Sequence, residues 1–425
     1  MEEKQTSRRL MVEPAFKRPQ EGETLIHLAV IRSAAILLTI TPAGLFSTSC
    51  HIGTVGSGVT QQPLFVQAPG SPMAFPGGAS NVCVGDMNND GTPDLVVANE
   101  RTRNIAVLLG QGDGRFRESA NRVAVKETPG EMVLGEVNGD AKLDLAFVSH
   151  DSYNVTLLLG DGKGGLTFAA NSPIVMKDGQ HPHTHGLALA DLNGDGALDL
   201  VTVNNSDNDV SIAIGDNHGN FTRVAPFAVG PSPYPLALGD VNNDRRPDIV
   251  ATATATGPHR AQQLPFSRAL TLLLADGHGG FSASQLPLRT GQPWFVAIAD
   301  LNGDHKPDIV ATHHEQNQLT VLLGDGRGGF TETSGSPFDF GRSAFQVLIA
   351  EVNHDGKPDV LAASGDSVRI MLGDGRGGFS LAPASPNITG GGTWRLAVGD
   401  LNKDGKVDVV TGNAEAESVS ILLGR

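Results

Sequence analysis

Seven segments of the chain place oxygen-bearing side chains at the first, third, fifth and ninth positions of a nine-residue motif. In DLNGDHKPD these side chains belong to Asp300, Asn302, Asp304 and Asp308. The other copies begin at Asp86, Glu136, Asp191, Asp240, Glu351 and Asp400. Three carboxylates held this close repel one another unless a positive charge lies between them. The acidic positions of the seven copies hold 21 of the 46 Asp and Glu residues, so much of the formal charge of −15 comes from these motifs.

Calcium binding is the chemistry that this set of oxygen donors suits. Ca²⁺ takes six to eight oxygen ligands in a tolerant geometry, whereas zinc and copper favour His or Cys. We expect up to seven Ca²⁺ ions, each bound by the side chains at positions 1, 3, 5 and 9 and by the backbone carbonyl at position 7. The candidate ligands are Asp86, Asn88, Asp90, Thr92, Asp94, Glu136, Asn138, Asp140, Lys142, Asp144, Asp191, Asn193, Asp195, Ala197, Asp199, Asp240, Asn242, Asp244, Arg246, Asp248, Asp300, Asn302, Asp304, Lys306, Asp308, Glu351, Asn353, Asp355, Lys357, Asp359, Asp400, Asn402, Asp404, Lys406 and Asp408.

Two other interpretations of the motif are weaker. An EF-hand loop needs Glu at position 12 and flanking helices, but position 12 is apolar or Thr in every copy and the flanking segments are β-rich. Asp and Asn also favour ordinary turns, although a turn alone does not require Asn at position 3 and Asp at positions 5 and 9 in all copies. Ala141, Arg245 and His305 replace the glycine that most easily adopts positive φ at position 6. The second copy, which also has Glu136, is expected to be the weakest calcium site.

The segments between the motifs predict β-strands throughout. Successive motifs start 50, 55, 49, 60, 51 and 49 residues apart, a period typical of blade or solenoid repeats. Each unit has an apolar run before the motif, a second after it, a third ending in LLG, and then a Gly-rich turn with Phe. We therefore predict an all-β fold, a seven-bladed β-propeller of four-stranded antiparallel blades. Residues 63–72 match the outer strand that the last unit lacks, so they should pair with the last blade and close the ring.

These motifs resemble a known family. DxNxDGxxD followed by an apolar strand, with LLGDGxGGF between copies, is similar to the FG-GAP and VCBS repeats. These repeats build the seven-bladed propeller of integrin α subunits and parts of many bacterial surface proteins. The resemblance covers residues 62–425. It implies calcium in the loop between the first two strands of a blade, on the face opposite the usual ligand site, and it does not identify a ligand.

The N-terminal region predicts export to the cell surface or the medium. A charged segment precedes a 14-residue uncharged apolar run and then small residues and Cys50, which is the layout of a signal peptide. A lipidated Cys50 and ordinary cleavage near Ser49 both remain open, as does a true start at Met11. The run is shorter than a spanning helix requires, so the lipid on Cys50 would be the only membrane attachment. We divide the chain into a targeting segment, 1–50, a linker, 51–61, and the propeller, 62–425.

Aromatic side chains recur at one position of the repeat, six residues before the motif. This position holds His185, Tyr234, Trp294, Phe345 and Trp394 in five consecutive units, and Ser80 and Gly130 in the first two. Flat side chains at one height of a ring suit stacking against sugar rings or apolar groups of a partner. The alternative is that they fill space between blades.

The function most consistent with these features is that of a monomeric binding or adhesion module for an extracellular glycan or surface protein. Nucleic acid is not expected as a partner, because no Lys/Arg-rich block occurs after residue 35. No linear catalytic motif is present. The alternative is a polysaccharide lyase or hydrolase, assembled from His185, Tyr234, His313, His314 and Glu315. The segment HPHTH at 181–185 offers imidazoles to a metal, but the sequence identifies no further ligand.

Overall fold

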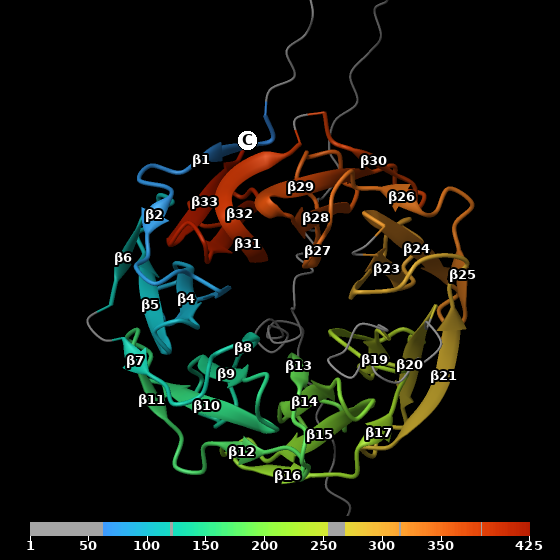
Figure 1. The fold of residues 1–425 in the computed structure, drawn as a ribbon, viewed down its shortest axis with the longest axis horizontal. Helices are drawn as coiled ribbons and strands as arrows, with labels where there is room; N and C mark the ends of the chain where they lie inside the picture. The colour runs from blue at the N-terminus through green and yellow to red at the C-terminus, as the bar shows by residue number, and fades with distance from the viewer. Residues whose placement is uncertain (1–62, 120–121, 254–267, 314–315, 384) are drawn as a thin grey trace, which may run out of the picture.

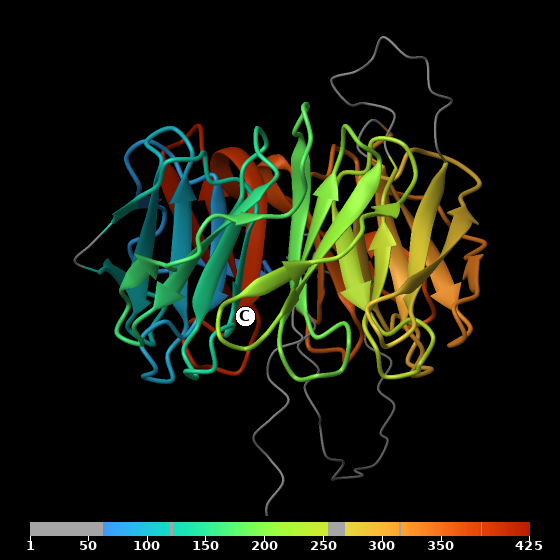
Figure 2. The same cartoon turned by 90° about the horizontal axis from the view of Figure 1, so that it is seen from below.

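The computed structural model describes residues 63–119, 122–253, 268–313, 316–383 and 385–425. These residues form a ring of antiparallel sheets around a central axis (Figure 1), and none of them is helical. Seen from the side, the strands run between the two faces of the ring (Figure 2). The predicted all-β propeller is confirmed.

The sheets divide into seven four-stranded units, in agreement with the predicted blade count. The first three are β3 (Asn81–Gly85), β4 (Asp94–Asn99), β5 (Asn104–Gly110) and β6 (Phe116–Glu118); β8 (Met132–Gly135), β9 (Asp144–Val148), β10 (Asn154–Gly160) and β11 (Leu166–Phe168); and β13 (Thr184–Ala190), β14 (Asp199–Asn204), β15 (Asp209–Gly215) and β16 (Phe221–Arg223). The next two are β18 (Leu236–Gly239), β19 (Asp248–Ala251), β20 (Ala269–Ala275) and β21 (Phe281–Pro287); and β22 (Phe295–Ala299), β23 (Asp308–His313), β24 (Gln318–Gly324) and β25 (Phe330–Glu332). The last two are β27 (Val347–Ala350), β28 (Asp359–Ala363), β29 (Gly365–Gly373) and β30 (Phe379–Leu381); and β31 (Asn387–Gly399), β32 (Asp408–Asn413), β33 (Ser418–Gly424) and β1 (Phe65–Gln67).

Burial follows the position of each strand in its blade. The second and third strands are almost entirely buried, as in β4 and β32, because neighbouring blades cover both of their faces. Continuous apolar runs such as DLVVAN are the sequence pattern of strands covered in this way. The outer strands are largely exposed, as in β16. The core therefore lies between blades: Val96 and Val107 of one blade pack in the same cluster as Leu145 and Leu158 of the next.

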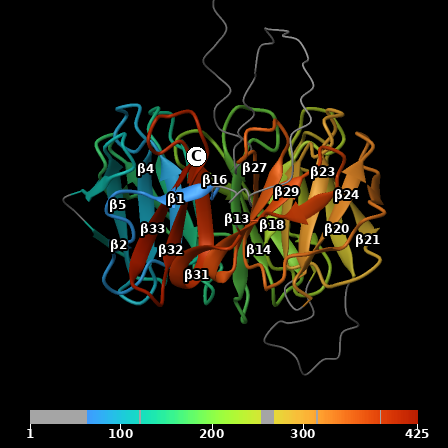
Figure 3. The ribbon, with the colours of Figure 1, turned by 90° about the horizontal axis from the view of Figure 1, so that it is seen from above.

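The N-terminal strand closes the ring as predicted. β1 pairs antiparallel with β33, with Phe65 opposite Gly424, and β2 (Met73–Ala74) pairs with the other end of β33. Figure 3 shows β1 lying across the outside of β33, and the C-terminus ends beside it in Figure 1. Phe65 is buried, so closure also completes the core of the last blade.

Two features of the sheets differ from the four-strand pattern. After the outer strand, a two-residue strand returns to pair with the third strand; these are β2, β7 (Val123–Ala124), β12 (Ile174–Val175), β17 (Phe227–Ala228) and β26 (Phe338–Asp339). In the sixth blade the first residues of the long strand β31 take this place, since Asn387 and Ile388 pair with β29. β31 then continues as the inner strand of the last blade, which joins the two blades into one nine-stranded sheet.

Several expectations concern residues outside the described ranges. They include the targeting segment 1–50 with Cys50, the linker 51–61, and the proposed catalytic residues His314 and Glu315. Most of residues 254–268, which account for the spacing of 60 residues between the motifs at Asp240 and Asp300, also lie there. Among the residues that the structure does describe, no helix meets the length and apolar character of a membrane span.

Candidate functional site

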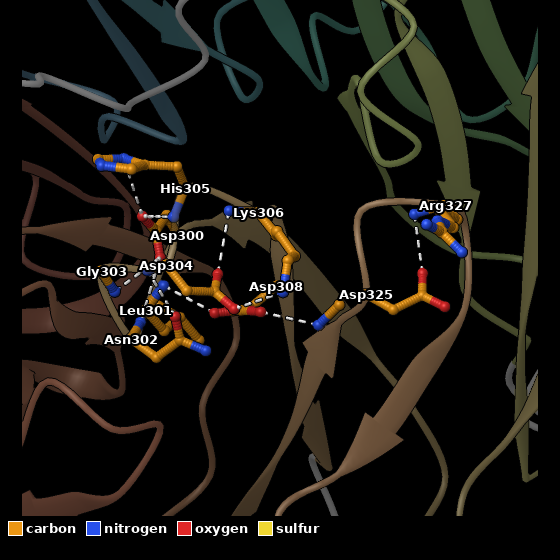
Figure 4. A network of polar contacts seen from close by, with 11 residues as sticks. Asp300, Leu301, Asn302, Gly303, Asp304, His305, Lys306, Asp308, Asp325 and Arg327 are labelled. Atoms are coloured by element: carbon orange, nitrogen blue, oxygen red, sulfur yellow. Dashed lines mark hydrogen bonds and ion pairs between the residues drawn. The ribbon is translucent and has the colours of Figure 1, made fainter.

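The ninth residue of each motif is a buried aspartate that ties three strands together. Asp308 begins β23; its Oδ2 accepts the backbone N–H of Leu301 at 2.9 Å and its Oδ1 accepts the N–H of Gly324 at 2.8 Å (Figure 4). Leu301 follows the first strand of the blade, and Gly324 ends the third. The same pair of bonds is made by Asp94, Asp144, Asp199, Asp248, Asp359 and Asp408. All seven carboxylates are at most 1% exposed.

Burial raises the pKa of these seven carboxyl groups. The pKa reaches about 6 in Asp144, Asp199, Asp248, Asp308, Asp359 and Asp408, and that of Asp94 moves in the same direction. The two backbone hydrogen bonds of each carboxylate oppose this shift, while the negative charges at positions 1 and 5 add to it. Each loop thus holds a buried negative charge next to two others, which a bound cation would stabilise.

The residues at positions 1, 3 and 5 fold the loop through hydrogen bonds to its backbone. Asp300 accepts the N–H of Asp304 at 3.2 Å and that of His305 at 2.8 Å. Asn302 Oδ1 also accepts the Asp304 N–H, at 2.9 Å. Asp304 Oδ1 accepts the N–H of Lys306 at 3.0 Å, and its Oδ2 receives Lys306 Nζ at 3.0 Å (Figure 4). Lys142 and Lys357 make the same contact in their loops. Position 7 was expected to contribute only its backbone carbonyl, so the contact of its cationic side chain was not predicted.

The loop requires positive φ at two positions. At position 6, the replacements Ala141, Arg245 and His305 adopt φ of 61°, 71° and 62°, as the glycines of the other copies do. Position 4 is also left-handed in every copy, even where it is His354 or Lys403. Asn and Gly predominate at position 4 because they tolerate this conformation best, a signal that was visible in the sequence but was not used.

The donor set of these loops fits a hard cation, because it consists of carboxylate, amide and backbone oxygens. Carboxylate oxygens that accept one N–H retain further lone pairs for a ligand. Within the described part of the chain, no group of three or more His, Cys, Asp or Glu side chains is already arranged around a common metal position. Calcium at these loops therefore stays a prediction.

A second site lies at the other end of the inner strands. Trp294 precedes β22 and Asp300 follows it, so the aromatic position and the loop are at opposite faces of the ring. A cavity of about 530 Å³ opens on the aromatic face. It is lined by Ser80, Asn81, Glu100, Gly130, Glu131, His150, Tyr234, Trp294, Phe295, Phe345, Trp394, Arg395 and Ala414. Four of the five predicted aromatic and imidazole residues thus line one cavity.

The aromatic rings stack from blade to blade around this cavity. The centroid of Tyr234 lies 3.8 Å from that of His185 and 4.6 Å from that of Trp294, and Phe345 and Trp394 are 4.3 Å apart. Trp394 is 44% exposed, and Tyr234, Trp294 and Phe345 are half-buried. His185 is only 2% exposed and packs behind Tyr234, so it does not line the cavity.

Polar and charged side chains also line the cavity. Arg395 Nη2 and Glu131 Oε1 are 2.6 Å apart, and the Arg395 guanidinium lies 5.1 Å from the centre of the Phe295 ring. This ion pair joins the last blade to the second, and its residues also line a channel of about 510 Å³ between the seven inner strands. Burial raises the pKa of Glu100, although the nearby His150 and Arg395 oppose the shift. Sequence analysis missed Glu131 and Arg395, which follow the aromatic position directly.

A family model of FG-GAP-like repeats matches residues 86–146, 136–202, 191–251, 300–362 and 351–411. Together these segments span more than half of the chain. The chain belongs to the FG-GAP-like repeat family. The resemblance found in the sequence is confirmed. No curated protein matches this FG-GAP-like repeat protein in sequence.

Solved structures resemble the FG-GAP-like ring at low sequence identity. BBS1N in complex with ARL6DN, soaked with lead, is 13% identical with a TM-score of 0.58, over 86% of this chain and 98% of that chain. An Agrocybe aegerita lectin that recognises non-reducing terminal N-acetylglucosamine is 17% identical, with a TM-score of 0.50 over 74% of this chain and 81% of its own. Virginiamycin B lyase from Staphylococcus aureus is 10% identical, with a TM-score of 0.52 over 83% and 98%. These similarities establish the fold alone.

Of the histidines considered for catalysis, His185 and His313 lie in the described residues, and neither lines the cavity of this FG-GAP-like protein. His313 is fully buried in β23, and its Nε2 lies 2.7 Å from Thr320 Oγ1. Burial lowers the pKa of both His313 and His185, because it disfavours the charged imidazolium. Neither has the access to solvent or substrate that a general acid or base needs. This placement argues against the lyase or hydrolase alternative as it was assembled from the sequence.

Asp308→Asn should destabilise the protein more than the same change at Asp304. The side-chain amide at residue 308 can accept only one of the two buried N–H hydrogen bonds. We therefore expect the free energy of unfolding to fall by about 1 to 3 kcal/mol. Asp304 is exposed, and its substitution should cost less than about 1 kcal/mol in metal-free buffer. Urea unfolding in the presence of a chelator measures both. Equal losses would contradict a structural role for the ninth position.

Proposed function

We propose that this FG-GAP-like propeller is an exported, calcium-stabilised binding module whose aromatic cavity binds an extracellular glycan. The proposal rests on how the residues that line the cavity are distributed among the blades. The fourth to seventh blades contribute the aromatic side chains, whereas the first two contribute Ser80, Asn81, Glu100, Glu131 and His150. A sugar ring has an apolar face and a hydroxyl-bearing edge, and these match the two halves of such a cavity.

The neighbouring folds support a binding role without naming the ligand. The propellers with similar folds include one in complex with another protein and a lectin with a glycan ligand. A surface protein is therefore the second partner class for the same cavity. The glycan is favoured because exposed Trp394 stacks on Phe345 at the cavity edge, where a flat ligand would extend the stack.

Trp394→Ala tests the cavity as the binding site. We expect a loss of about 2 kcal/mol in glycan binding, the scale of an interface hot spot, with an unchanged melting temperature because the indole is 44% exposed. The matched control is Ile388→Ala, which removes a side chain that is 62% exposed on the same strand, outside the cavity. A glycan array identifies the probe, and calorimetry with that probe measures both variants. Equal affinities of the two variants would refute the proposal.

In this proposal calcium binds the motif loops, on the face opposite the cavity, and stabilises the fold. Each site that is filled at a hundred times its dissociation constant adds about 2.7 kcal/mol to the free energy of unfolding. Millimolar Ca²⁺ should therefore raise the melting temperature well above its value in chelator, and equimolar Mg²⁺ should have less effect, because it requires stricter octahedral geometry. Calorimetric melting scans in the three buffers decide this point. The same melting temperature in Ca²⁺ and in chelator would contradict calcium binding.

Export is proposed from the N-terminal segment, with the mature chain beginning near Cys50. Mass spectrometry of the protein from its native cells should find a chain that lacks the first 49 or so residues, since signal peptides are cleaved after small residues. An added lipid mass would identify Cys50 as the anchor. A chain that retains Met1 in the cytoplasm would contradict export.

A further inference from the structure

Three histidines of two neighbouring blades meet beside the aromatic cavity. His183 Nε2 and His185 Nε2 lie 2.9 Å apart. The centroid of the His150 ring lies 4.4 Å from that of His185 and 5.8 Å from that of His183. His183 and His185 belong to the segment HPHTH at the start of β13, and His150 follows β9 in the preceding blade. The fold thus supplies a third imidazole that the sequence did not place there.

Packing and hydrogen bonding do not fully account for this cluster. His185 is 2% exposed, yet its Nδ1 has no hydrogen-bond partner while its Nε2 faces the Nε2 of another imidazole. The 2.9 Å contact is a hydrogen bond when one Nε2 carries a proton and the other does not. Two imidazole nitrogens that face each other are also the arrangement of two ligands on one metal ion. Zn–N bonds of about 2.0 to 2.1 Å at a tetrahedral angle separate the two nitrogens by about 3.3 Å, close to the observed contact.

We propose that His150, His183 and His185 bind a divalent transition-metal ion of the zinc class at the wall of the cavity. The three rings do not yet surround one point, in keeping with the absence of a preformed three-ligand group among the described residues. The Nε2 atoms of His183 and His185 already lie next to each other, so only the His150 ring has to rotate for all three to bind one ion. His150 is exposed and lines the cavity, where its ring has room to rotate. Glu100 also lines the cavity and lies near enough to His150 to interact with it electrostatically, so its carboxylate is the candidate fourth ligand.

Ligand chemistry separates this site from the calcium loops. Imidazole nitrogen favours Zn²⁺, Co²⁺ and Ni²⁺, whereas the oxygen donors of the loops favour Ca²⁺. The loops lie at the opposite ends of the inner strands, so the two metals do not share ligands. An ion held by these residues would lie beside the cavity, where the proposed ligand binds.

Zinc titration of the full chain, produced without a histidine tag and kept in millimolar Ca²⁺, tests the proposal. We expect one Zn²⁺ per chain by calorimetry. Co²⁺ in its place should give the intense visible absorption of a tetrahedral nitrogen-ligated ion. His150→Gln and His183→Gln should each weaken Zn²⁺ binding by about tenfold or more, the scale reported for disturbing such sites. These two variants are decisive because, unlike His185, their side chains are not fully buried.

His278→Gln is the matched control, since His278 is an exposed histidine on a hairpin turn away from the cluster. Its Zn²⁺ affinity should equal that of the unchanged protein. Three outcomes would overturn the proposal: no Zn²⁺ binding in excess Ca²⁺, binding that both cluster variants retain unchanged, or only the weak absorption of octahedral Co²⁺. In the last two cases the zinc would occupy other ligands, and the cluster would be a packed group of imidazoles.

Discussion

The whole ring depends on a carboxylate that is buried seven times in the same way. Each ninth-position aspartate accepts one N–H from the second residue of its motif and one from the residue that ends the third strand, while it begins the second strand. Backbone donors at such a crossing would otherwise be buried without partners. The third strand usually ends in glycine because a Cβ there would lie about 2.1 Å from a backbone oxygen, as at Gly324 and the Pro307 carbonyl. The DxNxDGxxD motif and the LLG ending are therefore both required by the same contact, in which the ninth-position aspartate accepts hydrogen bonds from the motif and from the end of the third strand.

This geometry divides the two faces of the propeller between different tasks. At one face the strands are joined by loops that repeat nearly the same hydrogen bonds in every blade. At the other face the corresponding residues differ between blades: Gly130, Tyr234 and Trp394 occupy equivalent places. Many binding proteins combine a constant scaffold with variable residues on one face, as the loop face and the aromatic face do here. The ion pair of Glu131 and Arg395 lies where the variable cavity meets the channel between the inner strands, since both residues line both.

Features that recur in every blade could be predicted from the sequence, whereas contacts between particular blades could not. The period of the seven motifs predicted the blades and their strands. The pairing of residues 63–72 with the last blade followed from their match to the outer strand that the last unit lacks. The short fifth strands were missed because residues such as Val123 and Ala124 form no visible apolar run. Contacts between blades were also hidden: no single unit shows that Arg395 reaches Glu131, or that His150 joins HPHTH. His185 shared its repeat position with the cavity residues, but stacking between His150 and Tyr234 buries it.

Native-state hydrogen exchange at the amides of Leu301 and Gly324 tests the central constraint most directly. Both amides donate to buried Asp308, so they should exchange only through global unfolding and rank among the slowest in the molecule. The amides of Asp304 and His305 in the same loop donate to the partly exposed carboxylate of Asp300 and to Asn302, and they should exchange much faster through local opening. If Leu301 and Gly324 exchange as fast as Asp304 and His305, the aspartate does not hold the blade together.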